Sequence, residues 1–218
     1  MTSIPSSGYY YPNRLALTAF KALVEVMGKN GFNAMLNLAH LGKYIQNYPA
    51  DDMERGFDFA DFSAIQSALE EMYGFEGSQL FIKRAGKATF EQSLRQYGAL
   101  AGVVNPAFRN LPLVAQIRIG IQALARIMTH VSDQMISVEE SETEIRYRVT
   151  RCPHCWGRSN EARPMCTFET GLLEESLAYF SGGLKFTVQE THCLSMGQAA
   201  CVYAIQKPRL NPDPSSQA

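Results

Sequence analysis

The chain has 218 residues, 46% of them hydrophobic, and a formal net charge of -1 at pH 7. This length fits one substantial domain with a hydrophobic core. With 20 Lys and Arg against 21 Asp and Glu, there is no basic field to attract nucleic acid. The start lacks the basic flank and apolar run of a signal peptide, and no later apolar run is long enough to span a bilayer. We therefore expect a cytoplasmic protein with no nucleic-acid partner and no membrane span.

The first part of the chain, up to residue 131, has a helical pattern. It follows a leader, residues 1–12, which is rich in Ser, Gly, Tyr and Pro and is expected to be flexible. Apolar residues recur at helical spacing from Arg14 to Met27 and from Asn33 to Tyr48, which predicts a helical hairpin. Both helices are apolar over more than one stripe, so a homodimer formed through them is expected. Further helices are predicted over 61–73, 89–100 and 111–131, while 79–84 fits either helix or strand.

The apolar pattern then changes to a period of two residues, which is typical of strands. Strands over 134–140 and 143–150 form one predicted hairpin, and strands over 184–190 and near 201–205 form a second. A helix over 166–180 lies between them. We predict an α+β fold with an antiparallel four-stranded sheet of two hairpins, covered by helices on one side, and an N-terminal helical hairpin. The single domain covers 13–207, with a helical part 13–131 and a sheet-containing part 132–207, and the tail 208–218 is expected to be disordered.

Three potential metal ligands surround one turn near the C-terminus: Glu190, Cys193 and Cys201. They can converge if the segment forms two strands joined by a loop, and Cys166 could supply a fourth ligand. Three thiolates and one carboxylate suit tetrahedral Zn²⁺ with no open position. Glu190 and Cys193 can meet at one metal only if regular strand alternation stops between them. The alternative is that these cysteines are small buried hydrophobic residues.

Several motifs in the C-terminal third follow one another in a specific order. They are Cys152-Pro-His-Cys155-Trp-Gly, Pro164-Met-Cys166, Gly171-Leu-Leu-Glu-Glu-Ser, Glu190-Thr-His-Cys193 and Gly197-Gln-Ala-Ala-Cys201. In this order they resemble the 4-vinyl-reductase domain family, also called hydrocarbon-binding proteins, with a resemblance that extends from Asn13 to Lys207. Members of that family resemble subunits of the TRAPP vesicle-transport particle in fold, and these often dimerise through their helices. The resemblance therefore implies a helix-covered antiparallel sheet.

The family also implies a cofactor. It includes ligand-sensing domains of aromatic-responsive transcription activators, in which a Cys, a Glu-x-x-Cys and a later Cys hold zinc. Cys166, Glu190, Cys193 and Cys201 match that pattern, so the resemblance implies zinc here. Because the site would be negatively charged, backbone N–H groups of residues 194–200 are expected to donate hydrogen bonds to it.

Other cysteines and histidines permit further interpretations. Cys152 and Cys155 form a CxxC motif in a predicted loop after a strand, whereas redox motifs of this kind begin a helix. They stay a possible secondary thiol or metal site, with His154 as a possible additional ligand. His40 and His130 lie on predicted helices, where a lone His is more often a satisfied polar group than a haem ligand.

A largely apolar pocket is expected where the 111–131 helix, the Cys166 helix and the inner face of the sheet meet. The candidate ligand contacts are Trp156, Thr170, Leu173, Phe186 and Val188. The alternative is a solid core.

The sequence indicates a binding role more than a catalytic one, because no Ser-His-Asp arrangement, phosphate loop or dinucleotide fingerprint is evident. We expect a zinc-stabilised binding protein for a hydrophobic or aromatic small molecule, such as a tetrapyrrole or its precursor, that acts as a carrier or accessory factor. One alternative is an enzyme or subunit of bacteriochlorophyll synthesis that reduces a vinyl group with an external electron donor. Another is an assembly protein that acts through its helical dimer interface.

Overall fold

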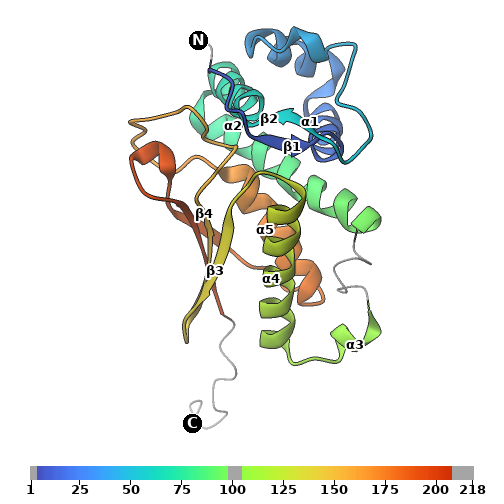
Figure 1. Cartoon of the computed structure of the whole chain (residues 1–218), viewed down its shortest axis with the longest axis vertical. Coiled ribbons are helices and arrows are strands. Elements are labelled where there is room, and N and C mark those ends of the chain that lie inside the picture. The colour runs from blue at the N-terminus through green and yellow to red at the C-terminus, as the bar shows by residue number, and fades with distance from the viewer. Residues whose placement is uncertain (1–3, 98–104, 208–218) are drawn as a thin grey trace.

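The computed structural model describes residues 4–97 and 105–207. Its main sheet has four antiparallel strands, arranged in the order β3-β4-β6-β5. They are β3 (Ile136–Glu140), β4 (Glu144–Val149), β5 (Val188–His192) and β6 (Cys201–Gln206). Helices α4 (Leu113–Val131) and α5 (Thr167–Phe180) run beside this sheet, and the N-terminal elements lie at one end of it (Figure 1). The predicted α+β class with a four-stranded antiparallel sheet is confirmed.

The two central strands bury one face. Tyr147 of β4 is paired with Tyr203 of β6, and Val149 is paired with Cys201. All four are buried, whereas Arg146 on β4 is exposed. Because side chains alternate between the faces of a strand, this register places Cys201 on the buried side of the sheet, at the end where β6 begins.

The N-terminal helices are longer than predicted, and each is interrupted at a glycine. Helix α1 (Asn13–Leu38) leaves helical geometry at Gly28, with φ 74°, and α2 (Phe59–Tyr97) does so at Gly74, with φ 69°. Glycine adopts such positive φ values without the steric cost that other residues incur. The segment 79–84, whose pattern fits either helix or strand, is part of helix α2. The predicted helix end at residue 100 falls outside the described residues.

The second predicted helix ends earlier than its apolar pattern indicates. The pattern continues to Tyr48, but α1 ends at Leu38 and is followed by a short 3₁₀ helix, η1 (Gly42–Tyr44). His40 adopts a positive φ of 59°, a conformation that cannot continue a right-handed helix. The apolar residues after this point therefore pack from an irregular segment.

The sequence does not predict a two-stranded ribbon near the N-terminus. Strand β1 (Tyr10–Pro12) pairs antiparallel with β2 (Arg55–Asp58). The Ser7 backbone N–H donates to Asp58 over 3.0 Å, and the Tyr10 N–H donates to Asp133 over 2.8 Å. Residues 4–12 are therefore held in place, which corrects the expectation of a flexible leader. The predicted disordered tail, 208–218, lies outside the described residues.

Helices α2 and α5 approach each other closely through glycines. A Cβ atom added to Gly86 would clash with the Phe168 carbonyl oxygen, and one added to Gly171 would clash with the Lys83 carbonyl oxygen. Only glycine permits this backbone contact, which fixes the start of α5 against α2. A short helix, α3 (Pro106–Arg109), precedes α4. Within the described part of the chain, no helix is long and apolar enough to cross a membrane.

Candidate metal centre and ligand cavity

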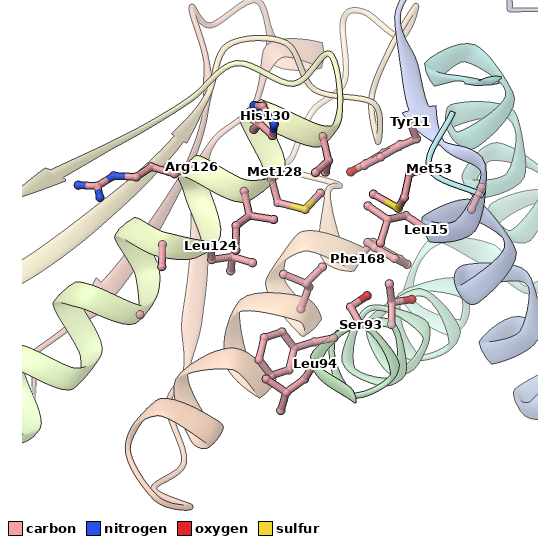
Figure 2. A pocket seen from close by; sticks show the side chains of 18 of the residues that line it. Tyr11, Leu15, Met53, Ser93, Leu94, Leu124, Arg126, Met128, His130 and Phe168 are labelled. Atoms are coloured by element: carbon pink, nitrogen blue, oxygen red, sulfur yellow. The ribbon is translucent and has the colours of Figure 1, made fainter. Parts of the chain in front are cut away.

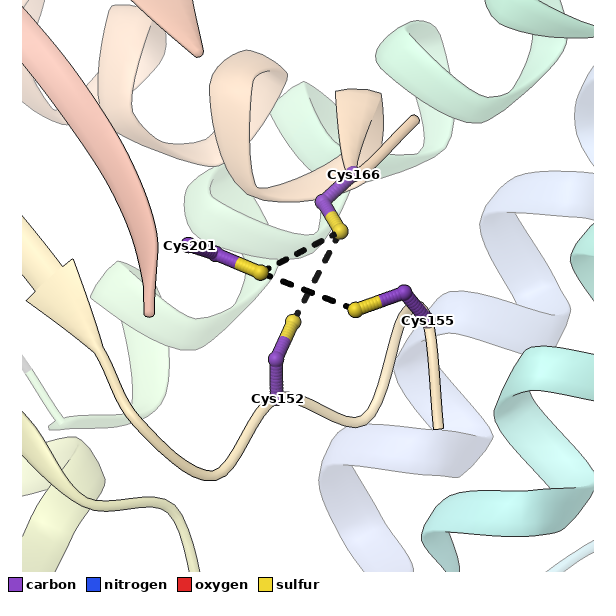
Figure 3. Close-up of side chains that lie close together, drawn as sticks. All are labelled: Cys152, Cys155, Cys166 and Cys201. Atoms are coloured by element: carbon purple, nitrogen blue, oxygen red, sulfur yellow. Dashed lines mark hydrogen bonds between the residues drawn. The ribbon is translucent and has the colours of Figure 1, made fainter. Parts of the chain in front are cut away.

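All five cysteines of the chain meet in one buried cluster. Cys152 and Cys155 lie in the loop after β4, Cys166 directly precedes α5, Cys193 follows β5 and Cys201 begins β6. Each is a free thiol with at most 3% of its surface exposed. Figure 3 shows four of them, with sulfur atoms directed toward one another from three separate segments. The sheet, the α5 helix and the β4–α5 loop are thus joined at one point.

The sulfur atoms lie at contact distance. Cys166 Sγ is 3.7 Å from Cys152 Sγ, 3.7 Å from Cys193 Sγ and 3.8 Å from Cys201 Sγ. Cys201 Sγ is 3.6 Å from Cys155 Sγ and 3.8 Å from Cys193 Sγ. Metal–sulfur bonds of about 2.3 Å in a tetrahedron place sulfur atoms roughly 3.8 Å apart. The observed spacing therefore fits tetrahedral thiolate coordination.

A break in strand β5 turns Glu190 and Cys193 toward the same point. The pairing of β5 with β6 shifts register between Glu190 and His192, which confirms the predicted end of regular alternation. Glu190 Oε2 accepts a 2.7 Å hydrogen bond from the Cys166 backbone N–H. Its other oxygen, Oε1, is buried and has no hydrogen-bond partner among the described residues. That oxygen is available to a metal ion.

Burial controls the protonation of this cluster. It raises the pKa of the Glu190 carboxyl to about 9, and the neighbouring Cys193 raises it further, while the Cys166 N–H opposes the shift. Burial also raises the pKa of the Cys152 thiol to about 12 and that of Cys166 well above its usual value. These groups keep their protons at neutral pH unless a cation replaces them.

The loop after Cys193 supplies hydrogen bonds to the sulfur atoms. The Leu194 backbone N–H donates to Cys201 Sγ over 3.4 Å, as expected for residues 194–200. Ser195 Oγ lies 3.1 Å from Cys193 Sγ. Gln198 accepts a 2.6 Å hydrogen bond from the Cys193 N–H and so closes the turn. Such contacts orient thiolate ligands and reduce their net negative charge.

Two overlapping groups of four residues could each hold a metal ion. One is Cys166, Glu190, Cys193 and Cys201, the set predicted from the sequence, and the other is Cys152, Cys155, Cys166 and Cys201. Within each group all donor atoms lie within 4.8 Å of one another. His154 belongs to neither group, because its Nε2 lies 3.1 Å from Glu169 Oε2. The CxxC cysteines thus join the main cluster instead of forming a site with His154.

A separate apolar cavity of about 490 Å³ lies between the helices (Figure 2). Helices α4, α5 and α2 form most of its wall, with β1, α1 and the segment before β2 closing it. Most of its lining residues are apolar: Tyr11, Leu15, Ala16, Met53, Phe62, Phe90, Leu94, Gly120, Ala123, Leu124, Ile127, Met128, Val131, Phe168, Leu172 and Phe180. Thr89, Ser93, Arg126 and His130 add polar groups. Such a cavity favours a hydrophobic ligand.

The polar groups of the cavity wall are mostly engaged already. The Tyr11 hydroxyl donates a 3.0 Å hydrogen bond to Gln134 Oε1, and burial raises the pKa of Tyr11 well above its usual value, so this group stays a donor. Thr89 donates to the Ala85 carbonyl oxygen over 2.8 Å. In Figure 2 the Arg126 side chain extends away from the other labelled side chains. The centre of the cavity therefore presents mainly carbon and sulfur.

The ligand contacts expected from the sequence lie elsewhere. None of Trp156, Thr170, Leu173, Phe186 and Val188 is among the lining residues. Trp156 packs on Tyr9 with ring centroids 5.3 Å apart, and Val188 is buried in β5. Helices α4 and α5 form walls as expected, but α1 and α2 replace the sheet. Helix α5 is buried on nearly every side, so its sequence does not reveal which face meets a cavity.

The cavity and the cysteine cluster share a wall of aromatic rings. Phe62 and Phe168 both line the cavity, with centroids 4.9 Å apart. The His154 ring, between Cys152 and Cys155 in the sequence, lies 4.8 Å from Phe62 and 5.1 Å from Phe168. A change at one site would therefore reach the other through direct ring contacts.

Solved structures with a similar fold include H-NOX proteins, a family described with haem. An H-NOX protein from S. oneidensis in the Fe(II)NO state has a TM-score of 0.56 and 13% identity, covering 88% of this chain and 99% of its own. A Shewanella woodyi H-NOX in the Fe(II)CO state, bound to IWP-051, scores 0.53 at 14% identity, covering 93% and 97%. A structure described by porphyrin distortion and haem redox potential scores 0.54 at 13% identity, covering 90% and 99%. At this identity the likeness concerns the fold alone.

These comparisons correct the prediction of zinc as the cofactor. The three structures are described by haem or by ligated iron(II), and none is described with zinc. The sequence pattern identified a set of donors that could hold a metal, but thiolate and carboxylate donors do not specify one metal by themselves.

A family model supports the motif-based resemblance. No curated protein sequence gave a significant match to the chain. The model of the 4-vinyl-reductase domain matches residues 145–207, a segment that contains β4, α5, β5, β6 and all five cysteines. The resemblance to the 4-vinyl-reductase domain family is thereby confirmed for residues 145–207, which form a domain of this type.

Proposed function

We propose that this protein binds a hydrophobic, aromatic small molecule in the cavity between α2, α4 and α5. The observation that carries the proposal is the cavity itself, about 490 Å³ in volume and lined mainly by apolar side chains. Sites for small ligands are usually about 300–1,000 Å³ and mostly apolar. An assembly protein with a solid core would have no use for such a space.

The ligand class that we favour is a tetrapyrrole or its precursor. Proteins of like fold are described with haem or porphyrin. The cavity is rimmed by His130 and contains the Met128 thioether, two groups that bind haem iron in other proteins. Haem would supply iron for binding gases or electrons, whereas the aromatic residues Phe62, Phe90 and Phe168 would pack on the flat ring system of any tetrapyrrole.

We favour a carrier or accessory role over catalysis. The Tyr11 and Thr89 hydroxyls each donate to another group of the protein, and the remaining wall is largely hydrocarbon. Such a lining holds and shields a ligand but offers few groups for proton transfer, which needs a positioned acid or base. Formation of a homodimer through the N-terminal helices is part of this proposal. Light scattering coupled to size-exclusion chromatography tests it, and a monomer mass at micromolar concentration would contradict it.

A dye-displacement titration tests the ligand class. N-phenylnaphthylamine, a neutral aromatic dye that fluoresces in apolar surroundings, should bind saturably to the folded chain. Protoporphyrin and haemin should displace it in proportion to their occupancy. Saturable dye binding without displacement would retain the apolar cavity and exclude the tetrapyrrole. Native mass spectrometry of freshly purified protein would report a copurified ligand directly.

A further inference from the structure

The two candidate metal groups in the cysteine cluster share two residues. Cys166 and Cys201 occur in both, whereas Cys152 and Cys155 belong to one and Glu190 and Cys193 to the other. The shared sulfur atoms lie 3.8 Å apart. Two four-ligand groups that share a pair of thiolates describe two tetrahedra with a common edge.

We propose that the cluster binds two soft metal ions, with the thiolates of Cys166 and Cys201 bridging them. One ion is held by Cys152 and Cys155 together with the two bridges. The other is held by Glu190 and Cys193 with the same two bridges. The proposal concerns this cluster alone and is independent of ligand binding in the cavity.

The sulfur spacing supports both halves of the cluster. In the first half, Cys152 Sγ lies 3.7 Å from Cys166 Sγ, and Cys155 Sγ lies 3.6 Å from Cys201 Sγ. In the second half, Cys193 Sγ lies 3.7 Å and 3.8 Å from the same two bridging atoms. All are close to the roughly 3.8 Å edge of a tetrahedral thiolate site. Figure 3 shows the four donors of the first half directed inward.

The sixth donor also faces the cluster. Glu190 Oε2 is occupied by the Cys166 N–H at 2.7 Å, but Oε1 is buried and unpartnered among the described residues. A buried carboxylate oxygen without a partner is costly unless a cation or donor satisfies it. A metal ion at the second half would satisfy it.

Charge favours two ions over one. Five thiolates and one carboxylate carry six negative charges, and two divalent ions would leave a net charge of two negative shared between two metals. A single ion in the Glu190 half leaves the same net charge on one metal and keeps two more thiols protonated beside it. Soft thiolate ligands select soft or borderline metal ions, and each thiol releases its proton to solvent as its metal–sulfur bond forms.

The alternative is one metal ion in the Glu190 half, with Cys152 and Cys155 donating S–H hydrogen bonds to its thiolates. Anaerobic titration of the reduced, metal-free full chain with Co²⁺ distinguishes the two. We expect thiolate-to-cobalt absorption to saturate at two ions per chain. Because bridging thiolates couple the two spins, the Co²⁺ electron paramagnetic resonance signal should rise with the first equivalent and fall with the second.

Variants assign the two halves. Changing Cys152→Ser together with Cys155→Ser should leave one Co²⁺ and an uncoupled signal, and Glu190→Gln together with Cys193→Ser should do the same. Met165→Leu is the matched control, because this buried thioether next to Cys166 belongs to neither group, and it should retain two ions. If the variants fail to fold by circular dichroism, the wild-type titration decides alone. Saturation at one ion or none, or two ions with additive signals, would overturn the proposal.

Discussion

The ring of Phe168 lies 5.1 Å from the imidazole of His154, centroid to centroid. Phe168 lines the apolar cavity, and His154 is flanked in the sequence by Pro153 and Cys155 of the CxxC loop. His154 Nε2 in turn lies 3.1 Å from Oε2 of Glu169, the residue after Phe168. The two sites are thus joined by one packed unit of side chains.

Removing the Glu169 carboxylate should weaken both sites. In Glu169→Ala the buried His154 ring loses its hydrogen-bond partner, which we expect to lower the free energy of unfolding by ~1–3 kcal/mol. The displaced ring should also disturb Phe168 and weaken dye binding. Urea unfolding and dye titration measure the two effects. Glu169→Gln keeps an oxygen acceptor and should lose less; equal losses for both variants would show that the hydrogen bond is unimportant.

The glycine contact between α2 and α5 should tolerate no side chain. Gly171→Ala would drive a methyl group against the Lys83 carbonyl oxygen, and forced overpacking costs about 1–3 kcal/mol or more. Thermal unfolding should show a lower midpoint. Gly31→Ala is the matched control, since its Cβ would meet only Met27 at 3.6 Å, and replacing a helical glycine by alanine should stabilise by up to ~1 kcal/mol. A stable Gly171→Ala variant would mean that the helices lie further apart.

Asp58 should stabilise the start of α2 in a pH-dependent way. Its carboxylate accepts hydrogen bonds from the Ala60 N–H at 2.8 Å and from Ser7. Burial raises its pKa, but the hydrogen bonds from Ser6, Ser7 and Ala60 outweigh this, so the pKa lies below its usual value of 3.8. The stabilisation is therefore full above that value and is lost as the pH falls through the lower folded pKa.

The variant Asp58→Ala tests this pH dependence. Loss of a helix cap of this kind typically costs ~1 kcal/mol, and the difference from wild type should shrink below about pH 4. Asp51→Ala serves as control, because this exposed partner of Arg14 should contribute little. A difference that is constant from neutral pH to about pH 3 would argue against the charge.

The sheet could be predicted because its information is local. Ile145, Tyr147 and Val149 alternate with polar residues, and this pattern alone places them on one face. The β1–β2 ribbon could not be predicted, since Tyr10–Pro12 and Arg55–Asp58 are short and show no alternation. Their pairing depends on contacts between residues far apart in the sequence.

The two sites differ in the same way. Glu190, Cys193 and Cys201 lie within one turn, and the register shift that brings them together follows from requiring them to meet. The approach of Cys152 and Cys155 depends on how the β4–α5 loop folds back, which spacing does not encode. The cavity brings Tyr11 and Met53 to α4 and α5. On α5, neighbouring Leu172 and Leu173 are equally apolar, yet only Leu172 lines the cavity.

The central claim is that the cavity holds a hydrophobic ligand, and filling it tests this most directly. Ala123 and Ile119 lie on the same helix, but Ala123 lines the cavity and Ile119 is 40% exposed outside it. We expect Ala123→Trp to occupy the space and weaken N-phenylnaphthylamine binding about tenfold or more, which corresponds to ~1.4 kcal/mol. Ile119→Trp should bind the dye like wild type. If Ala123→Trp folds and binds the dye as tightly as Ile119→Trp does, the cavity is not the binding site.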